Sequence, residues 1–131
     1  MTSFNILVVD DSPLARKIVR RVIEMSGLSV ETLLEASNGR EALETLERHW
    51  VDVVFTDINM PEMTGHDMIE RMAASRLLSS IPVIVVSTER SEARMEYLMR
   101  LGVRAYLTKP LTPEALRDTV RSVLALEEET P

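Results

Sequence analysis

Two short apolar runs of the sequence end on acidic residues. Asp10 and Asp11 follow the run 4–9, and Asp57 ends a predicted strand that is apolar at 53–55. An ionised carboxylate at the end of a buried strand must face water or be matched by cations, because an unpaired buried charge costs several kcal/mol or more. We therefore predict that these three carboxylates belong to a functional site.

Hydroxyl and ammonium groups end two further runs. Ser87 and Thr88 follow residues 81–86, and Lys109 follows residues 105–108. In an open parallel sheet, ligands bind beyond the carboxyl ends of the strands, near the point where the strand order reverses. A parallel sheet would therefore bring three carboxylates, a hydroxyl and an ammonium into one place.

A cluster of carboxylates is tolerable only with a cation, because like charges at short range repel one another. All-oxygen ligation suits Mg²⁺ or a similar hard ion, which takes one or two carboxylates, several waters and a phosphate oxygen. One carboxylate is then left to attack a phosphorus centre and form an acyl phosphate. Such a transfer needs cations around the phosphoryl oxygens, which Mg²⁺ and Lys109 would supply, while Ser87 could donate a hydrogen bond.

Five predicted strands alternate with five predicted helices, and this alternation would place the polar groups. The strands are expected at 4–9, 30–36, 51–56, 81–86 and 105–108. The helices are expected to begin at Ser12–Pro13, Asn38, Thr64–Gly65, Ser91 and Thr112–Pro113. Most strands are apolar throughout, which is typical of a parallel sheet covered on both faces. The run 30–36 is interrupted by Glu31 and Glu35 and is expected at a sheet edge.

Helical spacing predicts which side chains face the core. They are Ala15, Ile18, Val19, Val22 and Ile23 in the first helix, Met68, Ile69, Met72 and Ala73 in the third, and Leu116, Val120, Val123 and Leu124 in the last. Gly27 and Gly102 are expected to end the first and fourth helices, because glycine adopts the left-handed conformation of a helix end.

Length, composition and charge limit the class of protein. The 131 residues suit a single domain, with a core at about 4–126 and a frayed acidic tail at 127–131. The formal charge of −6 argues against nucleic-acid binding. The absence of cysteine excludes thiolate catalysis, and no apolar stretch approaches the roughly 20 residues that span a bilayer. We expect a soluble, cytoplasmic protein that binds neither nucleic acid nor membrane.

The sequence resembles the receiver domains of two-component response regulators, and among them the single-domain chemotaxis type. The resemblance covers about residues 4–126 and rests on four motifs in the family's order. They are Val9 to Ser12, Asp57 to Pro61 with Gly65 after it, Val86–Ser87, and Lys109–Pro110. Each motif alone is a weak signal, whereas all four in register are highly specific. The resemblance implies a doubly wound, flavodoxin-like α/β domain with a five-stranded parallel sheet of order 2-1-3-4-5.

The resemblance also implies roles for individual residues at the site. Asp57 would be the phosphoacceptor, and Asp10 and Asp11 would hold Mg²⁺, one directly and one through water. Asn59 would contribute its backbone carbonyl to the metal, which Asp57 also ligates. Lys109 would pair with the phosphoryl group.

Other family positions concern switching and modulation. Ser87 and Tyr106 would form the switch, in which the Tyr106 ring turns inward when Ser87 moves toward the phosphate. Three positions would modulate the site, namely Met60, Thr88 and Pro110, and a cis peptide bond would precede Pro110. Thr88 departs from the family, which usually has Ala or Gly after the switch hydroxyl. Its branched side chain is predicted to slow phosphoryl exchange.

The implied function is that of a phosphorylation-activated signalling switch. A histidine kinase or a phosphotransfer protein would donate the phosphoryl group, and the chain would catalyse only its own phosphorylation and dephosphorylation. Phosphorylation would change the binding of a downstream protein target at the surface of the fourth helix, fifth strand and fifth helix. The chain would be a monomer or a phosphorylation-dependent dimer.

Several alternatives stay open at this point. The chain could be a receiver module excised from a larger response regulator or hybrid kinase. An aspartyl-nucleophile phosphohydrolase would favour a second acid two residues after the nucleophile, where this chain has Asn59. A flavodoxin-like FMN binder would need a Ser, Thr and Gly-rich phosphate loop where Asp10 and Asp11 stand. These two acids could also be simple capping acids, and Tyr106 ordinary packing.

Overall fold

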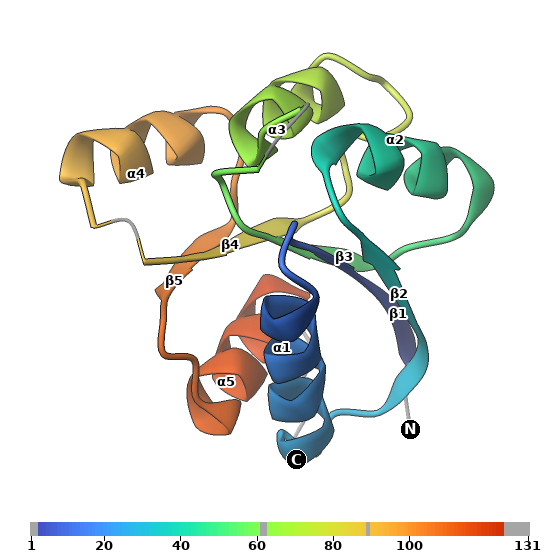
Figure 1. Ribbon diagram of the computed structural model, residues 1–131. Coiled ribbons are helices and arrows are strands. Elements are labelled where there is room, and N and C mark those ends of the chain that lie inside the picture. The colour runs from blue at the N-terminus through green and yellow to red at the C-terminus, as the bar shows by residue number, and fades with distance from the viewer. Residues whose placement is uncertain (1–2, 61–62, 89, 125–131) are drawn as a thin grey trace.

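The computed structural model describes residues 3–60, 63–88 and 90–124, in which five strands alternate with five helices (Figure 1). The strands are β1 (Phe4–Val9), β2 (Val30–Ala36), β3 (Val53–Thr56), β4 (Val83–Ser87) and β5 (Ala105–Thr108). The helices are α1 (Pro13–Met25), α2 (Gly39–Arg48), α3 (Gly65–Ala73), α4 (Glu92–Arg100) and α5 (Pro113–Val123). Every predicted element is present, although β3 and β4 begin later than predicted. None of the described helices has the length and apolar character needed to cross a membrane.

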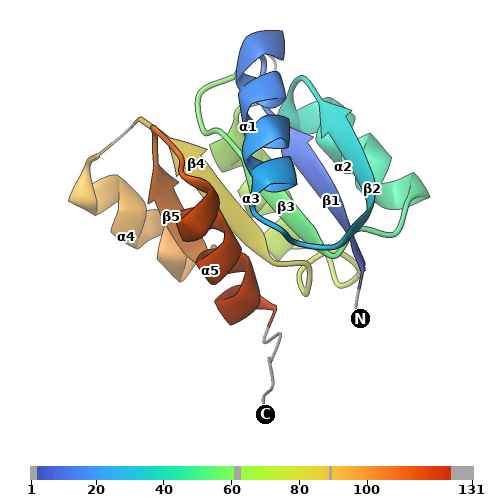
Figure 2. The same ribbon diagram turned by 90° about the horizontal axis from the view of Figure 1, so that it is seen from below.

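The strands form one parallel sheet of order β2-β1-β3-β4-β5. Helices α1 and α5 cover one face, and α2, α3 and α4 cover the other (Figures 1 and 2). This is the doubly wound flavodoxin-like fold implied by the resemblance, and β2 lies at a sheet edge as predicted. The chain runs from β1 out to β2 and returns past β1 to β3, so the strand order reverses between β1 and β3. Ligand sites of such sheets lie at the carboxyl ends of these strands.

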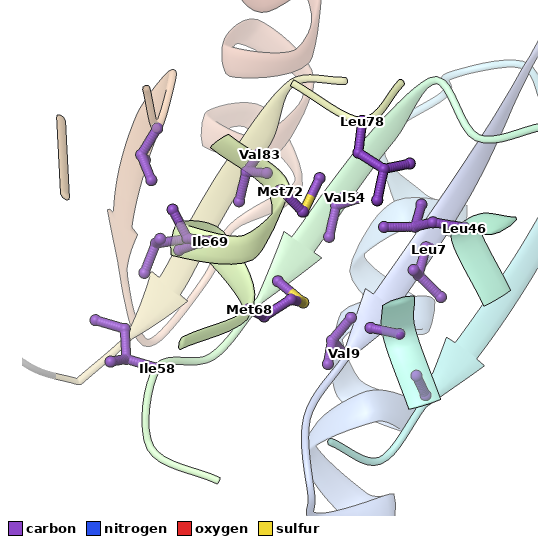
Figure 3. Close-up of a cluster of buried hydrophobic side chains, with 14 of the residues drawn as sticks. Leu7, Val9, Leu46, Val54, Ile58, Met68, Ile69, Met72, Leu78 and Val83 are labelled. Carbon is purple, nitrogen blue, oxygen red and sulfur yellow. The ribbon is translucent and has the colours of Figure 1, made fainter. Parts of the chain in front are cut away.

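Two apolar clusters bury the sheet, one on each face. All four residues of β3 are buried, because β3 is the central strand. The cluster under α2 and α3 includes Leu7, Val9, Val54, Met68 and Met72 (Figure 3). The cluster under α1 and α5 includes Ile6, Val8, Phe55, Leu116 and Val120. Successive residues of a strand face opposite clusters, so a shift of one residue in strand pairing would move each side chain to the opposite face of the sheet. Burial therefore fixes the register of the strands, and with it the position of their ends.

Side-chain caps set where the helices begin. Ser12 accepts a hydrogen bond from the Ala15 N–H at 3.1 Å, and Asn38 accepts one from the Glu41 N–H at 2.9 Å. The Glu41 carboxylate accepts from the N–H of Ser37, one residue before the cap, rather than from Asn38 as a standard capping box would have it. This fixes the exit of β2 into α2.

Two predicted core residues are exposed instead. Ile18 in α1 is 52% exposed, and Ala73 at the end of α3 is also exposed. Each residue of an α-helix is rotated by about 100° from the one before. The buried stripe of α1 is centred near Val19, so that Ile18 lies at its side, and Ala73 lies at the side of the stripe of α3 for the same reason.

Candidate functional site

Strand pairing places the predicted polar residues at the carboxyl ends of the strands. The N–H of Asp57 donates to the carbonyl of Val9 at 3.0 Å, which sets the end of β3 beside the end of β1. The N–H of Lys109 donates in the same way to the carbonyl of Ser87 at 3.0 Å. The parallel ladder therefore continues one residue beyond the strands and brings their polar ends together.

The ammonium of Lys109 lies between two carboxylates. Its Nζ is 3.3 Å from Oδ2 of Asp10 and 3.6 Å from Oδ2 of Asp57. The side chain of Asp10 is only 5% exposed, whereas those of Asp57 and Lys109 are 17% and 27% exposed. One cation thus compensates two carboxylates that would otherwise repel each other at the end of the buried strands.

Backbone N–H groups orient both carboxylates. Oδ1 of Asp10 accepts from the N–H of Ser12 at 3.0 Å, and Oδ1 of Asp57 accepts from the N–H of Ile58 at 2.7 Å. Each carboxylate therefore has one oxygen held by the chain that follows its strand, while the other oxygen faces Lys109. Groups of the chain itself therefore orient both acids.

Gly65 packs closely against the backbone of Asp57 and Ile58. Its N–H donates to the carbonyl of Ile58 at 2.7 Å. A Cβ atom at position 65 would lie 2.1 Å from the carbonyl oxygen of Asp57 and 3.0 Å from Cα of Ile58. Only glycine allows this approach, so the start of α3 fixes the position of the Asp57 loop.

The other predicted site residues differ in how far they are buried. Ser87 is 1% exposed, and Tyr106 is half-buried and packs against the apolar cluster under α2 and α3. Met60 is buried in the same cluster. Four of the predicted residues are exposed or lie at the surface, namely Asp11, Asn59, Thr88 and Pro110. The peptide bond before Pro110 is cis, as the resemblance implies.

Comparison with known proteins shows the family of this chain. Residues 6–121 match the family model of the response regulator receiver domain. The chain belongs to the response regulator receiver family. The match runs from within β1 to near the end of α5, and so contains Asp10, Asp57 and Lys109. Receivers of this family act in two-component signal transduction, where a histidine kinase is the implied phosphodonor, and are typically signalling modules rather than enzymes.

Several relatives are similar to the receiver over most of their length. Chemotaxis protein CheY1 of Helicobacter pylori strain J99 is 38% identical over 120 residues, which covers 91% of this chain and 95% of that protein. The chemotaxis protein CheY homolog of Campylobacter jejuni serotype O:2 is 36% identical and covers 91% of both chains. The structure of chemotaxis response regulator CheY4 of Vibrio cholerae has a TM-score of 0.79 at 33% identity, over 94% of this chain and all of that one. The receiver is therefore CheY-like.

Receivers of this family generally use Mg²⁺, and the donor set of this receiver fits such an ion. The described residues contain no group of three or more His, Cys, Asp or Glu side chains arranged to hold a metal. Mg²⁺ does not require such a group, because it keeps several waters and takes one or two carboxylates. Asp10 and Asp57 already converge on one cation, that of Lys109, and exposed Asp11 follows Asp10 in the chain.

One contact at the site of the receiver lay outside the sequence-based prediction. Arg16 donates from Nη1 to the backbone carbonyl of Asp10 at 2.6 Å. The available signal was Arg16 itself, a cation in the predicted helix that directly follows the acids. It is next to Ala15, which was predicted to face the core. A backbone acceptor has no signature in the sequence, and the partner of Arg16 was therefore missed.

Proposed function

We propose that this receiver accepts a phosphoryl group on Asp57 and that the modification changes its binding to a protein target. The convergence of Asp10 and Asp57 on the ammonium of Lys109 supports the proposal. In the transfer, an oxygen of Asp57 attacks the phosphorus of a phosphohistidine on a histidine kinase or phosphotransfer protein, and the P–N bond breaks. The imidazole leaves with the bonding electrons and takes up a proton, so that an acyl phosphate is formed.

The residues around Asp57 provide position and charge for this transfer. The oxygen of Asp57 that faces Lys109 lies 3.6 Å from its Nζ, close enough for the ammonium to contact a phosphoryl oxygen after attachment. Mg²⁺ supplies further positive charge when bound, held by Asp10, Asp11, Asp57 and the backbone carbonyl of Asn59. Gly65 and the N–H of Ile58 keep Asp57 in place. Positioning and electrostatic stabilisation together account for most of the catalysis of phosphoryl transfer.

Ser87 and Tyr106 would carry the change to the surface. The sheet register sets Ser87 opposite Thr108 and Tyr106 opposite Val85, so the two switch residues lie on neighbouring strands. A phosphoryl group raises the local negative charge to about −1.5 to −2, which would draw the Ser87 hydroxyl toward it. The Tyr106 ring would then fill the vacated space, and the surface of α4, β5 and α5 would change its affinity for the target.

Intact mass after incubation with acetyl phosphate tests the phosphoacceptor. The wild-type chain is expected to gain one phosphoryl group that requires Mg²⁺ and is released by hydroxylamine. Asp57→Asn is expected to gain none. Asp118→Asn is the matched control, because Asp118 is an exposed acid of α5 paired only with its neighbour Arg117 in the described ion pairs. An adduct that persists in Asp57→Asn, or the absence of any adduct in wild type, would contradict the proposal.

A further inference from the structure

Arg16 of α1 joins the loop that carries the acids to two rigid elements. Its Nη1 donates to the carbonyl oxygen of Asp10 at 2.6 Å, and its Nε donates to Oε1 of Glu35 on β2 at 2.8 Å. The side chain is only 17% exposed. The guanidinium of Arg16 therefore contacts both the loop between β1 and α1 and the edge strand β2.

The carbonyl of Asp10 lies where the ladder of β1 ends. The carbonyl of Val9 still accepts from the N–H of Asp57, and the N–H of Asp10 still donates to the carbonyl of Ala36. After this point the chain leaves the sheet and enters α1. Backbone carbonyls near a core need a hydrogen-bond donor, and Arg16 supplies one to Asp10.

Glu35 holds Arg16 in this position. Its carboxylate accepts from Arg16 through Oε1 and from Arg20, one turn further along α1, through Oε2. The hydrogen bond from Arg20, and next that from Arg16, hold the pKa of Glu35 below its usual value. The sheet register sets Glu35 beside Val8, two residues before Asp10. The anchor is thus an ionised carboxylate on the strand that neighbours the acid loop.

We propose that Arg16 is a positioning residue that holds the Asp10–Asp11 peptide in the orientation needed for Mg²⁺ binding. The inference rests on the proposed function, in which these acids hold the ion. With the carbonyl of Asp10 tied to α1 and β2, the carboxylates do not have to reorganise when the ion arrives. Two acceptors in different directions need the planar fork of arginine, which the single ammonium of a lysine does not reproduce.

Calorimetric titration of the full chain with Mg²⁺ tests the inference through affinity rather than phosphorylation. Arg16→Met is expected to weaken Mg²⁺ binding about tenfold, the lower end of the range for residues that support metal ligands. Arg16→Lys keeps the charge but is expected to restore only part of the affinity. Arg21→Met is the control, because Arg21 is an exposed residue of α1 whose described ion pair, with Glu24 at 3.7 Å, lies away from the acids. It is expected to bind Mg²⁺ like wild type.

Amide hydrogen exchange of Asp11 and Ser12 in Mg²⁺-free protein gives a second measurement. Exchange is expected to be faster in Arg16→Met and unchanged in Arg21→Met. If wild type, Arg16→Met and Arg16→Lys all bind Mg²⁺ with equal affinity, this inference is overturned and the proposed function is left intact. Wild type that binds no Mg²⁺ would overturn both. If Arg16→Met does not fold, Arg16→Lys and Glu35→Gln carry the same test, and unchanged Mg²⁺ affinity in these two variants would overturn the inference.

Discussion

The hydroxyl of Tyr97 on α4 donates a hydrogen bond to Oε2 of Glu70 on α3, with 2.8 Å between the two oxygens. The Tyr97 ring also packs against the His66 ring, with 4.9 Å between the ring centroids. The hydrogen bond favours the protonated phenol, and with desolvation it raises the pKa of Tyr97 above the usual value of 10.0. This contact ties α4, part of the proposed output surface, to the helix that begins behind Asp57.

Titration of Tyr97 tests this tie. In a Tyr106→Phe background Tyr97 is the only tyrosine, so the ultraviolet absorbance of phenolate reports on it alone. Its pKa is expected to lie above 10.0, and Glu70→Gln should bring it back toward that value. Because the pKa of Tyr97 is raised in the folded protein, the hydrogen bond to Glu70 is intact at neutral pH. It is lost as the pH rises through the pKa of Tyr97 in the folded protein. A pKa that does not respond to Glu70→Gln would contradict the assignment.

Glu35 is expected to contribute pH-dependent stability. Its pKa is lowered in the folded protein, so its contribution is present above the unfolded pKa near 4.5 and is lost as the pH falls through the folded one. Because the carboxylate is partly exposed, Glu35→Gln should lower the free energy of unfolding at pH 7 by only about 0.5–1 kcal/mol. Urea unfolding at pH 7 and below the folded pKa measures the difference. An equal loss at both pH values would rule out the ion pairs as its cause.

Gly65 is expected to tolerate no side chain. Gly65→Ala would force the Cβ atom against the carbonyl of Asp57, and such overpacking costs about 1–3 kcal/mol in the free energy of unfolding. The displaced Asp57 loop should also lose phosphorylation by acetyl phosphate. Ala73→Ser, an exposed change on the same helix, is the control for both measurements. A Gly65→Ala variant that is as stable as wild type and is fully phosphorylated would contradict the prediction.

Lys109 is expected to stabilise the protein before any metal or phosphoryl group binds. Lys109→Met leaves the carboxylates of Asp10 and Asp57 without their shared cation, and we expect a loss of about 1–2 kcal/mol, less than for a fully buried pair because Lys109 is partly exposed. Mg²⁺ should restore part of the loss, so the rise in melting temperature on adding Mg²⁺ should be larger than in wild type. Equal melting temperatures of the two proteins without Mg²⁺ would refute this.

Thr88 is expected to prolong the life of the acyl phosphate. Its exposed, branched side chain follows Ser87 and would crowd the approach of the hydrolytic water, so Thr88→Ala should lose its phosphoryl group severalfold faster. The decay of the phosphorylated mass after removal of acetyl phosphate measures the rate. Ser80→Ala, an exposed change in the connection before β4, is the control. Identical lifetimes in wild type and Thr88→Ala would refute the prediction.

The sequence predicted the strand ends well because residue type changes there abruptly, from apolar runs to Asp10, Asp57 and Lys109. Helix starts were equally visible, because caps such as Ser12 and Asn38 act on residues three positions away. Contacts between helices and strands were harder to predict from the sequence.

The missed contacts have two physical causes. The hydrogen bonds of Arg16 to the carbonyl of Asp10 and of Tyr97 to Glu70 depend on the packing of helices, which local patterns do not encode. The exposure of Ile18 and Ala73 follows from the helix rotation relative to the sheet, which apolar spacing fixes only to within the width of a stripe.

Only one residue of α4, Leu98, is fully buried in the structure. Local unfolding costs least where few apolar contacts are lost, so α4 should open with a smaller free energy than the strands beneath it. Asp10 and Asp57 instead follow β1 and β3, two interior strands that are paired with a neighbour on both sides. The receiver thus combines two acids on interior strands with a helix of the proposed output surface that has little buried side-chain area and should open while those strands stay folded.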